Sequence, residues 1–208
     1  MRSIKFLIAF LIPFTFACSE IEDEPTEIDL DELVMEFDDF IFVIDEINNY
    51  QSNIEKNNGP YSVNSGNPSE EELELILNPM LDNGNAIHIQ FKEVIYSSGV
   101  FDELTTQEQN ELSSEIDVMT DEQLVELSLI VNVNYYSEQM GSEDIDWNRI
   151  SHCVQAAVGV EALKTIIINS AEAAAVETII GALKLVGKRY LGWIGVGYMI
   201  YSFVQCIQ

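Results

Sequence analysis

The sequence predicts an all-α protein in which acidic amphipathic helices pack around a hydrophobic, Gly- and Ala-rich helical hairpin at the C-terminus. Two observations support this prediction. Over most of residues 28–148, apolar residues recur at three- and four-residue intervals with Asp and Glu between them, as on a helix with one buried face. Residues 149–208 are apolar on nearly every face, and such helices are buried in protein or in lipid.

Residues 1–17 have the layout of a secretory signal peptide. Arg2 and Lys5 give a basic start, and an apolar run follows over residues 6–16. A transmembrane helix needs roughly 20 apolar residues, so this run is too short to span a bilayer comfortably. We therefore expect the segment to be removed during export, and we exclude it from the fold.

A cysteine follows the signal segment directly. The sequence Thr15-Phe16-Ala17-Cys18 resembles the lipobox of bacterial lipoproteins, although Leu is usual at the position of Thr15 and a small residue at that of Phe16. In that family a diacylglyceryl group is attached to the cysteine and the signal is cut just before it. The resemblance implies that Cys18 is lipidated, with fatty acids such as palmitate. The alternative is an ordinary secretory signal followed by an incidental cysteine.

Residues 18–27 form an acidic tether. Its first side chains resemble the serine-plus-acidic export signal of surface-exposed lipoproteins of the Bacteroidota type, which implies a lipid-anchored protein of the outer membrane that faces the cell exterior. Like charges at this density stay solvated and cannot pack, so we also expect the segment to act as a flexible tether between the anchor and the domain. The residues that carry the resemblance are Ser19, Glu20, Glu22, Asp23 and Glu24.

The acidic part and the C-terminal part differ in charge. Of the 36 acidic residues 33 lie before Arg149, whereas only four of the nine basic residues do. The first part would be repelled by phosphate, and the second is too apolar and too weakly basic to bind it, so we expect no nucleic-acid partner. The membrane, reached through the lipid anchor, and an unidentified protein are the expected partners.

The acidic part, residues 28–148, is predicted to be helical almost throughout. An apolar stripe from Leu30 to Ile54 predicts a first helix of about 25 residues. Residues 56–68 then hold Asn-Asn-Gly-Pro and Asn-Ser-Gly-Asn-Pro, which end helices because they favour turns and remove an N–H donor.

Three capping boxes predict where later helices begin. In each, a hydroxyl accepts a hydrogen bond from the backbone three residues on, where a Glu or Gln side chain reaches back. They predict helices near residues 69–77, 106–118 and 121–139. The pairs are Ser69 with Glu72, Thr105 with Glu108, and Thr120 with Gln123.

Two shorter patterns in this part are ambiguous. Asp82-Asn83-Gly84-Asn85 resembles a fragment of a calcium loop, but it lacks the glycine register and terminal Glu of an EF-hand, so we predict a tight turn that opens a further helix through Phe91 and Ile95. Residues 131–135 alternate as in a strand. We assign them to the end of the helix over residues 121–139.

Breaks at Asn169-Ser170 and around Gly187 divide the C-terminal part into three predicted helices, near residues 151–168, 171–186 and 189–206. Residues 190–208 contain no charge and are just long enough to cross a bilayer. The acidic amphipathic helices need an apolar surface to cover, and this favours a buried core over a membrane helix.

Cys153 and Cys206 form an even pair once Cys18 carries lipid, and export places them in an oxidising compartment, so we predict a disulfide between them. A plain three-helix path would leave them roughly 25 to 30 Å apart. A disulfide allows at most about 7 Å between Cα atoms. The disulfide therefore requires an even number of passes, most simply a hairpin that turns near Asn169-Ser170, or a path with an extra break near Gly192 to Gly197.

The sequence contains no recognisable catalytic or metal-binding motif. His88 and His152 are the only histidines, and we interpret them as core or partly exposed rings. We expect no catalytic residue, no metal and no cofactor, and a non-enzymatic protein with a binding or structural role at the bacterial envelope. The alternative is a toxin or bacteriocin-like precursor, in which the disulfide-closed C-terminal region attacks membranes and the acidic part shields it.

Overall fold

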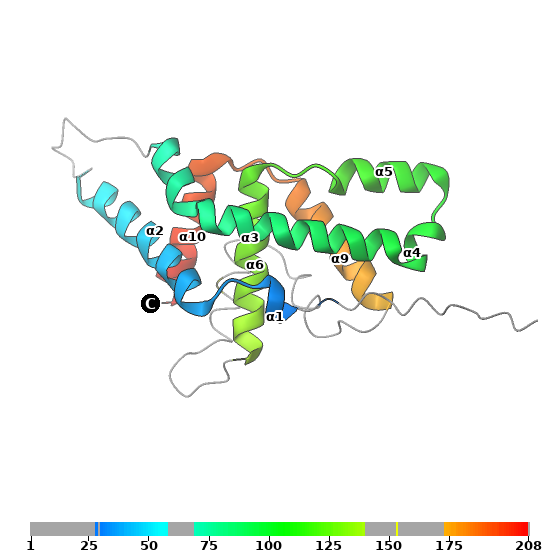
Figure 1. Ribbon diagram of the computed structural model, residues 1–208. Coiled ribbons are helices and arrows are strands. Elements are labelled where there is room, and N and C mark those ends of the chain that lie inside the picture. The colour runs from blue at the N-terminus through cyan, green and yellow to red at the C-terminus, as the bar shows by residue number, and fades with distance from the viewer. Residues whose placement is uncertain (1–27, 29, 58–68, 140–152, 154–172, 208) are drawn as a thin grey trace, which may run out of the picture.

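The computed structural model describes residues 28, 30–57, 69–139, 153 and 173–207. All regular structure in these residues is α-helical, with no strand among them, so the predicted all-α class is confirmed (Figure 1). The described helices are α1 (Leu30–Leu33), α2 (Phe37–Asn57), α3 (Glu70–Ser97), α4 (Gly99–Asp102), α5 (Thr106–Ile116), α6 (Asp121–Gln139), α9 (Ala173–Gly187) and α10 (Gly192–Ile207).

Helix α3 runs across the molecule and crosses α6, and the other helices flank this pair (Figure 1). At one end of α3, α10 packs against α2, and towards the other end α9 packs against α5. The predicted helices at 106–118, 121–139, 171–186 and 189–206 all appear within a few residues of their expected bounds. The helix predicted near 151–168 lies outside the described residues, as does the turn expected near residues 169–170.

The core contains side chains from both the acidic and the hydrophobic parts of the chain. In α6 every residue from 123 to 134 is buried, so the helix is surrounded by protein, although it belongs to the acidic part. Such all-round burial explains why the sequence shows little helical periodicity there. From the C-terminal part, Leu183 and Ile200 are completely buried, and α6 thus shares the centre with the predicted hydrophobic block. Within the described residues, none of the helices combines the length and the apolar character needed to span a bilayer.

The single helix predicted from Leu30 to Ile54 is wrong, because the chain breaks between α1 and α2. The backbone N–H of Met35 donates to Oδ1 of Asn132 at 2.8 Å, and the hydroxyl of Tyr136 donates to the carbonyl of Met35. Both backbone groups of Met35 are therefore bonded to α6. These long-range bonds replace the hydrogen bonds that a continuous helix would form there.

The turn predicted at residues 82–85 is also wrong, because these residues lie inside the continuous helix α3, as does Pro79. A Cβ atom added at Gly84 would lie 1.9 Å from the carbonyl oxygen of Leu124. Glycine therefore lets the backbones of α3 and α6 touch at their crossing. Beside it, Asn83 donates to the carbonyl of Leu33 at 2.6 Å, so a sequence typical of turns forms a helix contact here.

The three predicted capping sites all begin helices. The Thr105–Glu108 box is complete, with bonds in both directions. At Ser69 the hydroxyl accepts from the N–H of Glu72 at 3.4 Å, but the Glu72 carboxylate accepts from the hydroxyl of Tyr50 instead of reaching back. The same Tyr50 oxygen accepts the N–H of Ser69 at 2.8 Å, so a side chain of α2 completes the start of α3.

Candidate functional site

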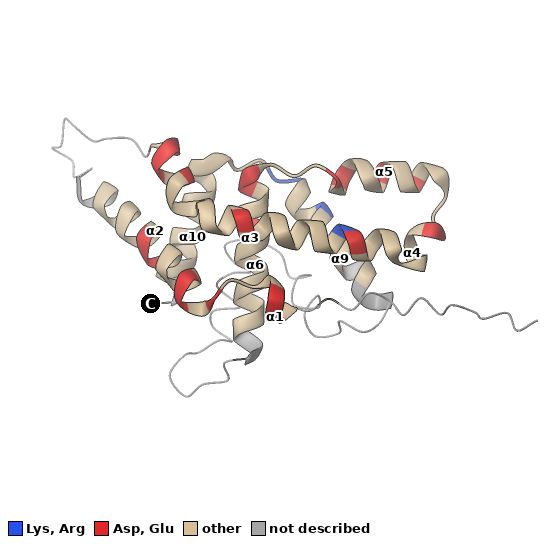
Figure 2. Cartoon of the chain, in the orientation of Figure 1, with Lys and Arg blue, Asp and Glu red and all other residues tan. Residues whose placement is uncertain are grey.

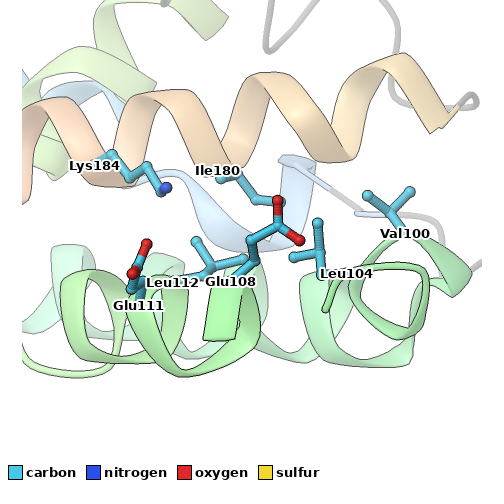
Figure 3. A pocket seen from close by; sticks show the side chains of 7 residues that line it. All are labelled: Val100, Leu104, Glu108, Glu111, Leu112, Ile180 and Lys184. Carbon is cyan, nitrogen blue, oxygen red and sulfur yellow. The ribbon is translucent and has the colours of Figure 1, made fainter. Parts of the chain in front are cut away.

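A groove of about 290 Å³ lies between α9 on one side and α4 with α5 on the other (Figure 3). Its apolar wall is formed by one side chain from each helix and one from the turn between α4 and α5. Charged groups from α5 and α9 lie at its edge. The lining residues are Val100, Leu104, Leu112 and Ile180, with Glu108, Glu111 and Lys184.

The capping box at the start of α5 fixes one edge of the groove. The backbone N–H and the hydroxyl of Thr105 donate to Oε2 of Glu108 at 2.9 and 2.6 Å. These bonds from Thr105 hold the pKa of Glu108 below its usual value, since they stabilise the ionised form. Glu108 therefore lies beside the groove as a carboxylate, already bonded to the first turn of its own helix.

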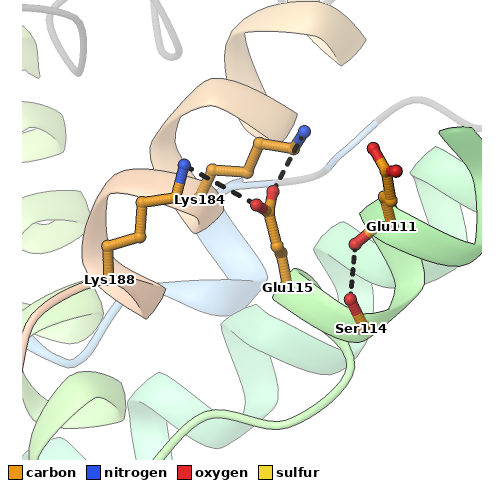
Figure 4. A network of polar contacts seen from close by, with 5 residues as sticks. All are labelled: Glu111, Ser114, Glu115, Lys184 and Lys188. Carbon is orange, nitrogen blue, oxygen red and sulfur yellow. Dashed lines mark hydrogen bonds and ion pairs between the residues drawn. The ribbon is translucent and has the colours of Figure 1, made fainter.

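An ion-pair cluster joins α5 to α9 next to the groove (Figure 4). The ammonium of Lys184 lies 3.0 Å from one oxygen of Glu115, and that of Lys188 lies 3.6 Å from the other. The hydrogen bond from Lys184 is the main reason that the pKa of Glu115 lies below its usual value. All three side chains are partly solvent-exposed, so the cluster contributes little to stability and mainly sets how the two helices align.

The remaining charged group at the groove edge is also engaged within the protein. Oε1 of Glu111 accepts a hydrogen bond from the side-chain amide of Gln107 at 2.8 Å, and the hydroxyl of Ser114 donates to the backbone carbonyl of Glu111 (Figure 4). Counted with the adjacent ion-pair cluster, three glutamates (Glu108, Glu111 and Glu115) lie beside two lysines (Lys184 and Lys188), so the edge keeps one net negative charge. The groove thus combines an apolar wall with a negative edge.

The described residues that line the groove present aliphatic side chains, two carboxylates and one ammonium group. Among the described residues that line it, none is Ser, Cys or His. Across the described part of the chain, there is also no cluster of three or more His, Cys, Asp or Glu side chains that could hold a metal ion. Ligand pockets are commonly about 300 to 1,000 Å³. At its size, the groove fits one apolar side chain or a similar small group.

A second charged pair is structural. Glu126, 1% exposed, pairs with the guanidinium of Arg189, which follows α9. Burial raises the pKa of Glu126, and the nearby Arg189 opposes that rise. The neighbouring amide of Gln123 donates to the carbonyls of Gly187 and Arg189 at 2.8 and 2.7 Å, so the start of α6 holds the end of α9.

The structure joins Cys153 and Cys206 by a disulfide, as predicted, with 5.6 Å between the Cα atoms. It also places His88 in the core, where Nε2 lies 2.6 Å from the carbonyl of Ile116 and therefore carries the donated proton. Burial lowers the pKa of His88, and the interpretation of this ring as a core residue is confirmed. His152 lies outside the described residues. So do the predicted lipidation and export residues, Cys18, Ser19, Glu20, Glu22, Asp23 and Glu24.

The sequence did not reveal the groove. The capping box of Thr105 and Glu108 is recognisable in the sequence because its partners are three residues apart, but that spacing predicts a helix start and not a groove. The pairing of Glu115 with Lys184 joins distant segments and has no local signal. Comparison with known proteins adds no further guide, because no family model, curated protein or solved structure matches the chain.

Proposed function

We propose that this chain is a non-enzymatic lipoprotein of the bacterial outer membrane, anchored through Cys18 and facing the cell exterior, whose helical domain binds a protein partner. The observation that carries the proposal is the Ala17-Cys18 junction, placed after an apolar run and before an acidic segment. A tether of ten residues, 18–27, reaches at most about 35 Å when extended. The domain that begins near Ile28 would therefore stay close to the membrane surface.

The groove between α5 and α9 supports the binding role. Its apolar wall accepts an apolar side chain, and its acidic edge favours a basic residue next to that side chain. The net charge of −27 acts in the same direction, because it attracts basic partners over a longer range and repels acidic ones. We infer a partner segment in which an apolar residue is flanked by Lys or Arg.

The burial of the C-terminal helices favours this role over the toxin-like alternative. Ala182 in α9 and Val196 in α10 are completely buried, and α10 packs against α2, α3 and α6. Release of the C-terminal region would expose apolar surface on the acidic part as well as on the released piece. Cleavage near residues 141–142 in cells, with release of a C-terminal piece that makes vesicles leak, would favour the toxin hypothesis over the proposed lipoprotein role.

Metabolic labelling with a fatty acid tests the anchor. We expect label on the wild-type chain and none on Cys18→Ser, because the thioether to the diacylglyceryl group needs the sulfur atom. Cys153→Ser is the matched control and keeps the label, since it removes a cysteine that the structure engages in a disulfide. An unlabelled wild-type chain would overturn the anchoring proposal.

Site-specific photo-crosslinking in intact cells tests the groove. A photoreactive amino acid in place of Val100 should capture the partner, because this position lines the groove. The same replacement at Val118, which is 81% exposed but does not line the groove, is the control and should give no such adduct. Glu111→Lys should weaken capture at position 100 if the acidic edge contributes. Capture that is equal at both positions would contradict a groove-specific partner.

A further inference from the structure

Helices α4 and α5 contribute few side chains to the core, and they lie at one end of the molecule (Figure 1). Helix α4 has no buried residue, and α5 has only two, Leu112 and Ile116. By contrast, nine residues of α3 are buried, and α6 is buried on all sides over residues 123–134. Because burial of apolar side chains is the main force that holds a helix in place, residues 99–117 are held less firmly than α3 and α6. We call residues 99–117 the strap.

Polar contacts attach the strap to α3. Nε2 of His88 lies 2.6 Å from the carbonyl of Ile116, the last residue of α5. One and two turns further along α3, Lys92 donates to the carbonyl of Asp117 at 3.4 Å and the hydroxyl of Tyr96 donates to Oδ1 of Asp117 at 2.7 Å. Asp117 is solvent-exposed, so water can replace both of its bonds at little cost.

Polar contacts also attach the strap to α9. Figure 2 shows acidic residues on α5 and basic residues on and just after α9. The carboxylate of Glu115 pairs with Lys184 and with Lys188, and all three side chains are partly exposed (Figure 4). Such pairs add little stability, because water and salt screen them. The strap is therefore held on both sides mainly by contacts that solvent can replace.

Non-helical residues at both ends of the strap can act as hinges. Ser98, between α3 and α4, has an extended backbone with a ψ angle of 142°. Residues 118–120, between α5 and α6, are not helical, and Val118 is 81% exposed. Rotation at these two points would move the strap without breaking α3 or α6.

We propose that the strap opens and closes as one unit and thereby controls entry of a ligand side chain into the groove. The strap supplies five of the seven lining residues, and α9 supplies the other two, Ile180 and Lys184 (Figure 3). Opening therefore removes one wall of the groove, and closing packs that wall against the ligand. The inference rests on the proposed function in one respect, which is that the groove is the binding site.

Hydrogen exchange of the full chain, followed by mass spectrometry, measures this opening. A detached helix of 11 residues is too short to be stable in water, so the amides of α5 exchange when the strap opens. Relative to their intrinsic rates, they should exchange at least about 100-fold faster than the amides of α6, which exchange only when the core unfolds.

Reversal of one charge tests the attachment to α9. Glu115→Lys places a third positive charge beside Lys184 and Lys188, and we expect exchange in α5 to rise by about 5-fold or more while exchange in α6 stays unchanged. Glu74→Lys makes the same charge change at an exposed position near the other end of α3. This control should change exchange in α5 by less than about 2-fold.

Thiol labelling with iodoacetamide detects opening even if α5 stays helical as it moves. Leu112→Cys places a thiol in the groove wall, where the native side chain is 3% exposed, and Leu129→Cys places one in α6, where it is 0% exposed. Cys at position 112 should react at least about 10-fold faster than Cys at position 129, and Glu115→Lys should accelerate only the former. Circular dichroism checks that each variant folds, and Ile116→Cys replaces Leu112→Cys if that variant unfolds.

Three outcomes would overturn the strap. The first is equal protection of α5 and α6 in the wild type, and the second is equal labelling at positions 112 and 129. The third is fast exchange in α5 with slow labelling at position 112, because the helix would then fray in place without opening the groove. Neither measurement involves a partner, so crosslinking at position 100 still decides the proposed function separately.

Discussion

The backbone N–H of Met35 donates to Oδ1 of Asn132, and this bond holds the connection between α1 and α2 against α6. The side-chain amide of Asn132 donates in turn to Oδ1 of Asn83 and to the backbone carbonyl of Ser128, each at 2.8 Å. Asn132 is completely buried, so water cannot replace any of these partners. One side chain thus links three segments that are distant in the sequence.

We expect Asn132→Ala to lower the free energy of unfolding by about 3 kcal/mol, because it leaves the Met35 N–H without its bond and removes two donated bonds. Urea unfolding followed by circular dichroism measures the change. Asn49→Ala, at an exposed position of α2, serves as the control and should stay within about 0.5 kcal/mol of the wild type. Equal unfolding midpoints for both variants would argue against the network.

The crossing of α3 and α6 predicts a large effect of one methyl group. Gly84→Ala places a Cβ 1.9 Å from the carbonyl oxygen of Leu124, so the helices must move apart, and we expect a loss of at least about 2 kcal/mol. At Gly181 in α9 an added Cβ meets nothing within 4 Å. Gly181→Ala should therefore be neutral or stabilising by up to about 1 kcal/mol. Thermal unfolding compares the two, and a Gly84→Ala variant as stable as Gly181→Ala would contradict the described crossing.

The disulfide between Cys153 and Cys206 closes a loop with a sequence separation of 53. In the chain-entropy model such a loop contributes about 4 kcal/mol, within a range of about 0 to 5 kcal/mol. Cys206→Ser should lower the unfolding temperature accordingly, whereas Cys18→Ser should not change it. Mass spectrometry of unreduced peptides from envelope-derived protein checks the bond itself, and free thiols at both positions would disprove it.

His88 predicts a pH dependence of stability. Burial lowers the pKa of His88 in the folded chain below the ordinary 6.5, so the unfolded chain binds the proton more readily. This stabilising contribution is complete above about pH 6.5 and is lost as the pH falls towards the folded-state pKa. Between pH 7 and pH 5 the wild type should therefore lose more stability than His88→Gln, which does not titrate. Parallel stability curves for the two proteins would refute the prediction.

The acidic tether predicts the orientation of the anchored protein. Amide replacements at its four acidic residues, Glu20, Glu22, Asp23 and Glu24, should move the protein to the inward-facing leaflet. Protease treatment of intact cells should then remove the wild type but spare the variant. Four replacements at exposed acidic residues of the folded domain, Asp38, Glu70, Glu71 and Glu74, control for charge and should leave the protein accessible. If the tether variant is removed as readily as the wild type, the segment acts only as a leash.

The features that the sequence predicted correctly depend on residues close together along the chain. Helix starts at Thr105 and Thr120 follow from hydrogen bonds that span only three residues. The all-α class follows from apolar spacing repeated over whole helices. The pairing of Cys153 with Cys206 could be predicted from the number of cysteines and the expected oxidising compartment, because only these two cysteines remain once Cys18 is assigned to lipid.

The sequence by itself therefore determined the all-α class, the helix starts at the capping sites and the cysteine pair, whereas the tertiary structure decided where α1 and α2 separate and that α3 continues through residues 82–85. The break at Met35 depends on its hydrogen bond to Asn132. The sequence around Gly84 predicts a turn, but in the structure Gly84 lies inside a helix, where it allows close contact between the backbones of α3 and α6. The groove needs α9 beside α5, because its lining side chains come from both helices. Local patterns report interactions within a few residues, while exposure, close backbone contact and surface charge depend on which segments fold together.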